Sequence, residues 1–468
     1  MKKKISRDFL IVLMLALLHL PLGVVLYSAG SLNVLHPLFI FGLGLFLAFR
    51  KPVNLNHVCL VVAYIIGAEV LWRMAQATVA WEFGKYASAT ILLVALVRSK
   101  KFEIPSLPLL YFALLIPACI LTIVDRDLSS VTPTLSFNMS GPLVLMVSCW
   151  FFYKQRISPL QFRRLLCAMI IPLICVAVTA LFYTVTAEEI SFNTESNFET
   201  SGGFGPNQVS GMLGLGVYLS VAGFILFKKW SPFSLFFGAA TLLFSAICVL
   251  TFSRGGIYNA IGGIVVLLIF GLQDIGSGLR RIAPVLVLGG LFLFFIYPVL
   301  DDFTGGHLQE RFEDTGTTNR SSIAQSDFQI FFENPVLGVG VGAAYAYRQR
   351  FISEKAASHT EFSRMVSEHG AFGLAALILM LVMLFVNLKR PNSTPGKAFV
   401  AGLMAWACLF MTNTGMRLAA ASFVWGISFI TIAAVRPNLA AIYRRVKERK
   451  LLQERESAAK SLKPAKSF

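Results

Sequence analysis

Apolar runs long enough to cross a membrane recur from one end of the chain to the other. Of the 468 residues, 56% are hydrophobic and only 14% are charged, whereas soluble domains have roughly 25% charged residues. A helix needs about 17 to 25 apolar residues to cross a hydrocarbon core of roughly 30 Å. We therefore predict an all-α, polytopic transmembrane helical bundle. The expected spans are residues 9–27, 32–49, 57–73, 79–97, 107–124, 135–153, 165–186, 208–227, 233–252, 255–272, 282–300, 371–388, 398–413 and 419–435.

The third and fourth of these fourteen spans are the weakest. Glu69, Arg73, Glu82 and Lys85 interrupt their hydrophobicity. Because charged side chains inside a bilayer are costly, a bundle of about twelve spans is the alternative. We expect 12 to 14 spans.

Basic residues are concentrated in every second connection between the spans. If the N-terminus is cytoplasmic, 30 of the 41 lysines and arginines lie on the cytoplasmic side, as the positive-inside rule requires. The formal net charge of +17 therefore indicates orientation and contact with acidic membrane lipids. It implies no binding of nucleic acid. We expect both termini to be cytoplasmic.

One connection is much longer than the others. Residues 301–370, expected on the outer face, carry ten acidic and six basic residues. Loops this long are usually functional or disordered, and the helical pattern of this one favours function. The predicted organisation is N-terminal transmembrane helices (1–200), a transmembrane core that includes this outer loop (201–435), and a basic cytoplasmic tail (436–468).

The sequence predicts neither a cofactor nor a metal. All seven cysteines lie inside apolar runs, so they form no disulfide framework and no spaced metal site. Asp125-Arg126-Asp127 has the spacing of a metal-diphosphate motif, but no second carboxylate cluster or histidine follows it closely. A solvated loop is the favoured interpretation there.

Three arginines on the expected outer face are candidates for binding an anion. Arg254 lies in "TFSRGG" between two apolar runs, Arg320 lies in the outer loop, and Arg417 lies in "TNTGMRLAA". An arginine at the bilayer centre costs about 2.5 to 3.5 kcal/mol on insertion scales, so Arg254 is either an interfacial anchor or a ligand in a wet cavity. Because the planar guanidinium suits bidentate phosphate contacts, we predict one diphosphate-binding cavity. The structural alternative pairs Arg320 with Asp314 or Asp327.

Two capped helices are expected within the outer loop. Ser322 and Gln325, followed by phenylalanines at helical spacing, predict an amphipathic helix on the membrane surface that stops at 334–335. In "ASHTEFSRMVSEHGAFG" we expect Ser358 to be the N-cap and His359 the first helical residue. A helix N-terminus disfavours imidazolium, so this histidine should be neutral. A surface histidine without a role is the alternative.

The acidic residues that follow His359 and the glycines that precede it could each serve either binding or structure. Glu361, Arg364 and Glu368 have helical spacing, so they could simply pair with one another. Gly338 and Gly340 in "PVLGVGVGAAY" would let backbone amides approach an anion, and a flexible turn is equally favoured.

These segments, in this order, resemble the O-antigen ligase and Wzy-type polymerase superfamily of bacterial membrane glycosyltransferases. The resemblance covers roughly residues 203–434 and includes "GFGPNQVSG", which contains Asn207. Members act on glycans carried by undecaprenyl diphosphate at the outer leaflet of the cytoplasmic (inner) membrane, without nucleotide sugar or metal. The resemblance implies that Arg254 and Arg320 contact the diphosphate and that His359 acts on the acceptor side. This chain has His359-Thr360 where many relatives have His-Asn, and it lacks the aromatic residue that often follows the loop arginine.

Three functions are compatible with these observations. The first is an inverting, metal-independent ligase that transfers a glycan from undecaprenyl diphosphate to lipid A-core or a similar acceptor on the periplasmic face. The second is a polymerase that extends a growing polysaccharide. The third is a secondary transporter, which should show internal repeats and broken helices, and no convincing repeat is present. The expected catalytic and substrate-binding residues are Arg254, Arg320, His359, Arg417, Asn207, Gly338, Gly340 and Glu361.

Overall fold

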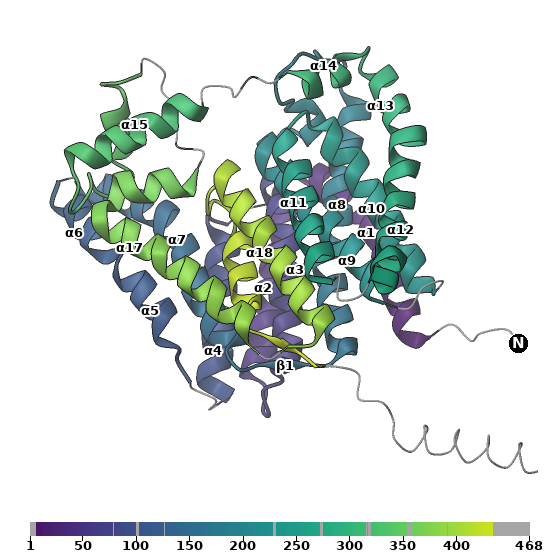
Figure 1. Ribbon diagram of the computed structural model, residues 1–468, viewed down its shortest axis with the longest axis horizontal. Helices are drawn as coiled ribbons and strands as arrows, with labels where there is room; N and C mark the ends of the chain where they lie inside the picture. The colour runs from purple at the N-terminus through teal and green to yellow at the C-terminus, as the bar shows by residue number, and fades with distance from the viewer. Residues whose placement is uncertain are drawn as a thin grey trace, which may run out of the picture.

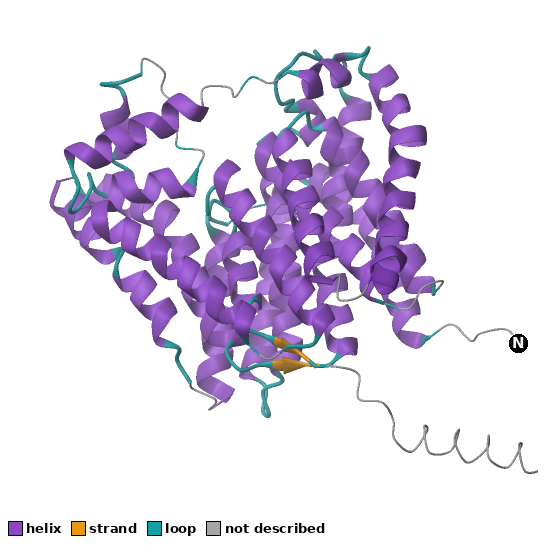
Figure 2. Cartoon of the chain, in the orientation of Figure 1, coloured by secondary structure: helices purple, strands orange, loops and turns teal. Residues whose placement is uncertain are grey.

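The chain folds almost entirely into helices. The computed structural model describes residues 6–433 except 78, 100–102, 126, 228–230, 272–274, 315, 317–319, 353–357, 359 and 391. The predicted cytoplasmic tail and His359 therefore lie outside the described residues. Figure 2 shows helix throughout, with two short strands at one end.

Helices succeed one another along the described part of the chain. The first part comprises α1 Arg7–Ser28, η1 Gly30–Val34, α2 Leu35–Phe49, α3 Leu55–Met74, α4 Phe83–Ser99, α5 Ser106–Ala113, α6 Ile116–Asp125, α7 Leu128–Phe152, β1 Arg156–Ile157 and α8 Pro159–Thr186. The second part comprises η2 Glu199–Ser201, α9 Pro206–Leu226, α10 Pro232–Leu250, α11 Arg254–Gly271, α12 Ile275–Leu291, η3 Phe292–Ile296, α13 Tyr297–Phe303, α14 His307–Glu313, α15 Arg320–Glu333, α16 Ala344–Arg348, α17 Glu361–Lys389, α18 Thr394–Asn413, α19 Ala419–Ile427 and β2 Thr431–Ile432.

The bundle has two distinct ends. At one end β1 and β2 pair in parallel, with Arg156 opposite Thr431. The start of α1 lies at the same end, because Asp8 forms ion pairs with Arg163 and Arg164 in the first turns of α8. In Figure 1 the strands lie at the bottom, and α14 and α15 lie at the top. The described residues of α14 and α15 therefore lie at the end opposite to β1, which we call the outer end after the topology expected from the sequence.

Twelve helices of the described chain are long and apolar enough to cross a membrane, which confirms the polytopic all-α prediction. The other two predicted spans are present as shorter elements. The span expected at 79–97 is α4, which has 17 residues. The span expected at 419–435 is wrong as a continuous helix. It is the nine-residue α19, after which the chain becomes extended and joins β1 through β2.

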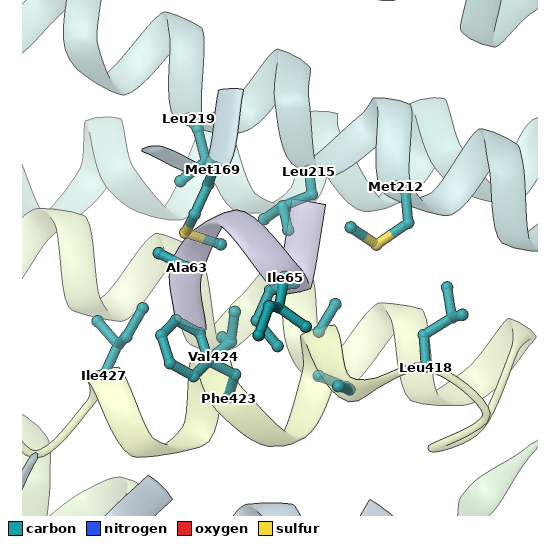
Figure 3. Packing of buried hydrophobic residues seen from close by; sticks show 14 of the residues in the cluster. Ala63, Ile65, Met169, Met212, Leu215, Leu219, Leu418, Phe423, Val424 and Ile427 are labelled. Atoms are coloured by element: carbon teal, nitrogen blue, oxygen red, sulfur yellow. The ribbon is translucent and has the colours of Figure 1, made fainter. Parts of the chain in front are cut away.

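One hydrophobic core connects the two halves of the chain. Side chains of α3 and α8 in the first half pack on side chains of α9 and α19 in the second half, as Figure 3 shows for Ile65, Met169, Leu215 and Phe423. Helices before and after residue 200 therefore share one core.

Close backbone contact between α9 and α11 fixes the geometry of the outer end. A Cβ atom at Gly214 would lie 2.2 Å from the carbonyl oxygen of Gly256, so only glycine allows this approach. The contact brings the N-terminal ends of the two helices together. Asn207 in the first turn of α9 thereby lies beside Ser253, which precedes α11, and the Ser253 hydroxyl donates to Asn207 Oδ1 at 2.7 Å.

Candidate active site

A cluster of three arginines lies at the outer end of the bundle. Arg254 is the first residue of α11, Arg311 belongs to α14, and Arg320 is the first residue of α15. The guanidinium of Arg254 donates to the carbonyl oxygens of Asp314 and Gly316, the latter at 2.8 Å. Its Nη2 is also 3.9 Å from the Asp314 carboxylate. Arg254 thus holds the segment that leads from α14 to α15.

Arg311 is the most buried member of the cluster. Its Nε donates to the carbonyl oxygen of Phe252 at 2.8 Å, and its Nη1 lies 3.5 Å from the Asp314 carboxylate. Burial lowers the pKa of Arg311, and the positive charge of Arg254 lowers it further. The sequence gives no signal for a role of Arg311, because nothing in "LQERFED" distinguishes it from other surface arginines.

Arg320 contacts neutral amides instead of a carboxylate. Its Nη1 donates to Asn413 Oδ1 at 2.9 Å and its Nη2 to Asn207 Oδ1 at 3.4 Å. It forms no ion pair within the part of the chain that the structure describes. Burial lowers the pKa of Arg320, and the nearby charge of Arg254 lowers it further. The guanidinium is therefore a cation beside another cation, without a described counter-ion.

The structural alternative, in which Arg320 pairs with Asp314 or Asp327, is not seen among the described residues. Asp314 pairs with Arg254 and Arg311. Asp327 is fully buried and binds Arg348 at 2.7 Å. The reason is geometric, because Arg320 begins α15 and Asp327 lies two turns away on the face that packs against α16 and α17.

A cavity of about 570 Å³ lies apart from these three arginines, none of which lines it. It is lined by residues of α4, α7, α16, α17 and the turn between α18 and α19. Four aromatic rings and several charged groups face it: Trp81, Tyr86, Phe137, Tyr345, Glu82, Arg348, Glu361, Arg364, Glu368 and Arg417. We call it the outer cavity.

Charged side chains in the wall of the outer cavity neutralise one another. Arg364 pairs with Glu361 at 2.5 Å and with Glu368 at 2.6 Å, which confirms the pairing expected from their spacing. Glu361 also accepts the backbone N–H of Met416 at 3.2 Å. Arg417 donates to the carbonyl oxygen of Ser358 at 2.9 Å. The structure therefore places Arg417 and Glu361 in the wall of the outer cavity, whereas Arg254 and Arg320 do not line it.

The turn after α18 joins the two regions. Asn413 contacts Arg320, while Gly415, Met416 and Arg417 line the outer cavity. Four Cα–Cα steps of 3.8 Å separate residues 413 and 417, so their Cα atoms are at most about 15 Å apart. One short segment of backbone thus contributes to the arginine cluster and to the cavity wall.

Gly338 and Gly340 serve packing in this structure. Both have positive φ, 68° and 89°. A Cβ at Gly338 would lie 2.5 Å from the carbonyl of Glu368, and one at Gly340 would lie 2.9 Å from Thr122 Oγ1. Their amides donate to the carbonyl oxygens of Asn334 and Glu368. Because an anion would need these N–H groups, the geometry favours a tight structural turn.

The start of α17 differs from the expectation. The N-cap is Thr360, whose hydroxyl accepts the N–H of Phe362, and the helix begins at Glu361. Ser358, the expected N-cap, instead donates its hydroxyl to Asp327 at 2.8 Å. The buried carboxylate of Asp327 accepts this proton in a charge-assisted hydrogen bond, and Thr360 accepts the helix N–H in place of Ser358. Ser358 lines the outer cavity, so the chain on one side of His359 is at that wall.

A buried ion network contacts the wall of the outer cavity through Glu82 and the backbone of Arg417. Arg73 pairs with Glu69 at 2.9 Å, and Lys85 pairs with Glu82 at 2.5 Å. Arg73 also donates to the carbonyl oxygen of Arg417 at 3.1 Å. These four residues are the ones that interrupt the hydrophobicity of the third and fourth predicted spans. Charged residues within membrane-spanning segments indicate a functional region.

Within the described residues, no group of three or more His, Cys, Asp or Glu side chains could hold a metal ion. Asp127, from the Asp125-Arg126-Asp127 segment, is the N-cap residue of α7. Arg126 lies outside the described residues.

Comparison with known proteins gives one family. Residues 239–378 match the family model described as O-Antigen ligase. The match runs from α10 into α17 and includes Arg254, Arg311 and Arg320. No curated protein matches the chain. The match therefore supports an O-antigen ligase or Wzy-type assignment for residues 239–378, which form less than half of a chain whose described part has twelve helices long and apolar enough to cross a membrane.

Proposed function

We propose that this protein transfers a glycan from a lipid-linked diphosphate, undecaprenyl diphosphate by family resemblance, to an acceptor hydroxyl. The observation that carries the proposal is the charge of Arg320, which lies beside Arg254 and has amide partners only among the described residues. A half-buried cation without a counter-ion is costly. A diphosphate would supply the missing negative charge.

The reaction breaks the bond between the anomeric carbon and the diphosphate oxygen. The bonding electrons leave with the phosphate oxygen, and the acceptor oxygen forms the new bond to the anomeric carbon. Direct attack inverts the anomeric configuration. Guanidinium groups already in place stabilise the charge that develops on the leaving group. Because two arginines can supply this stabilisation, the mechanism proposed here uses no metal.

The acceptor hydroxyl must lose its proton during the attack. The resemblance implies that His359 acts on the acceptor side, and we assign it the role of the general base that takes this proton. Its neighbour Ser358 lies in the wall of the outer cavity. We therefore assign the acceptor to this cavity, where aromatic rings and fixed polar groups provide the usual lining of a small-molecule site.

The experiment uses the purified full-length protein in lipid nanodiscs, with lipid-diphosphate-linked glycan as donor. Arg254→Lys and Arg320→Lys keep the positive charge but remove the planar fork. The loss of a charge-assisted contact costs about 1.5 to 3 kcal/mol, so we expect transfer to fall roughly ten- to a hundredfold. Arg350→Lys is the matched control, because Arg350 is exposed at the same end. Parental rates in both Arg254→Lys and Arg320→Lys would refute the proposal.

The choice of acceptor separates the two family activities. We propose the ligase, with lipid A-core or a similar glycolipid as acceptor. A product on lipid A-core supports this assignment. Elongation of lipid-linked glycan in place of lipid A-core modification identifies a polymerase of growing polysaccharide and leaves the role of the arginines intact.

A further inference from the structure

A second cavity, of about 400 Å³, lies at the β1 end of the bundle among α1, α2, α3 and α8. At its mouth the polar residues belong to the first turns of three of these helices: Asp8 of α1, His57 of α3, and Arg163 and Arg164 of α8. Deeper in the cavity, the polar residues His19 and Tyr64 form a hydrogen bond of 2.8 Å with each other. The remaining lining is mainly apolar. We call it the inner cavity, and it is on the opposite end of the molecule from the arginine cluster.

The depth of the inner cavity corresponds to one leaflet of a bilayer. Its lining extends along α1 from Asp8 to His19, which is about 16 Å at a rise of 1.5 Å per residue. The hydrocarbon core is roughly 30 Å thick, so the cavity reaches about half of it. Ile11, Leu15 and Leu43 line the cavity and are 43%, 36% and 36% exposed. An acyl chain can therefore enter from the side, between α1 and α2.

The polar mouth of the inner cavity has an excess of positive charge. Arg163 lies 3.2 Å and Arg164 2.7 Å from the two oxygens of the same carboxylate, Asp8. One carboxylate balances only one guanidinium. The Arg163 guanidinium is 3.9 Å from the centre of the Phe233 ring, which fixes its orientation. The Arg164 side chain is 46% exposed and retains donors for another ligand.

We propose that the inner cavity binds one anionic phospholipid. The acyl chain occupies the apolar part between α1 and α2, and the phosphate lies at Arg163, Arg164 and His57. A zwitterionic lipid could fill the apolar part but would leave the excess charge unmatched. Acidic lipids are attracted to basic groups at this membrane surface. This site is independent of the proposed glycosyl transfer.

The test is native mass spectrometry of the full-length protein with equimolar phosphatidylglycerol and phosphatidylcholine of identical acyl chains. We expect one retained lipid per chain and a preference for phosphatidylglycerol that falls as salt is raised. Arg163→Gln with Arg164→Gln should reduce that preference by about tenfold or more, since each basic residue contributes about 1 kcal/mol. Arg98→Gln, an exposed arginine at the same end, should keep it.

A second variant makes the test independent of the ion pairs with Asp8. Leu15→Trp fills the apolar part without changing charge, so we expect loss of the retained lipid of either type while the protein stays folded by its melting curve. Equal retention of the two lipids by the parental protein would overturn the proposal. So would an unchanged preference in the double arginine variant, or retention in Leu15→Trp equal to the parental protein.

Discussion

Asn207→Asp tests whether the charge of Arg320 is used to bind the donor. The substitution is nearly isosteric and leaves every arginine in place. Asn207 Oδ1 already accepts from Arg320 at 3.4 Å and from the Ser253 hydroxyl at 2.7 Å, and a carboxylate can keep both contacts. The variant therefore supplies the counter-ion that Arg320 lacks among the described residues. If the donor diphosphate normally fills this role, the new carboxylate should compete with it.

The size of the effect follows from the distances. A phosphate on the free edge of the Arg320 guanidinium would lie roughly 6 Å from the new carboxylate, where two unit charges repel by about 3 kcal/mol at an effective dielectric constant of about 20. Asn207 is only half-buried, so solvent and salt reduce this value. We expect donor affinity to fall by roughly ten- to a hundredfold.

The assay is the initial rate of glycan transfer as a function of donor concentration, in nanodiscs at low and at high salt. The apparent KM for the donor should rise in Asn207→Asp, and the increase should be smaller at high salt. Gln349→Glu is the control, because it makes the same charge change at an exposed position of the same end. A donor KM equal to that of the control at low salt would show that the Arg320 charge does not contact the diphosphate.

Three further predictions concern topology, metal and stability. In a background without the seven native cysteines, a membrane-impermeant thiol reagent added outside should label Cys at Gln349 but not at Asn54, and labelling of Asn54→Cys in intact cells would reverse the topology. Transfer by the purified protein should continue in EDTA, and a loss that magnesium or manganese restores would contradict the metal-independent mechanism. Arg73→Met leaves Glu69 buried without its partner and should destabilise the protein by about 3 to 5 kcal/mol, seen as a lower melting temperature in detergent. Lys154→Met, which removes an exposed ion pair with Glu103, should leave that temperature unchanged.

The transmembrane helices were predictable because the bilayer imposes a length and a composition on each span. That constraint fails for α19, whose apolar run is long enough for a span but continues as an extended segment that pairs with β1. Pairing between residues 156 and 431 is a tertiary contact, which hydropathy along the chain does not contain. The charges of α3 and α4 weakened the prediction of those spans for a related reason. Glu69 and Arg73 are buried against each other and face the protein interior instead of lipid.

The candidate site was predictable in part, through the family resemblance. The segment that contains Asn207 and the loop that contains Arg320 do meet, as their hydrogen bond shows. Arg311 and Asn413 could not be identified, because their roles depend on where α14 and the end of α18 lie in space. In the sequence, only its charge relates Arg417 to Arg254 and Arg320. Its hydrogen bond to the carbonyl oxygen of Ser358 places it in the wall of the outer cavity instead.

The sequence leaves two roles open for Arg254, a membrane-surface anchor or a ligand of an anion. Its contacts in the structure add a third role, because it also binds the backbone of the outer loop. Its side chain is 15% exposed and binds the backbone at residues 314 and 316. Because Arg320 follows Gly316 by only four residues, Arg254 restrains the loop that brings Arg320 to Asn207 and Asn413. An anchor at the lipid surface would not need such contacts. A diphosphate that binds both Arg254 and Arg320 would therefore bind two groups whose spacing Arg254 helps to maintain. Substitution of Arg254 should remove one ligand of the diphosphate and also loosen the position of Arg320.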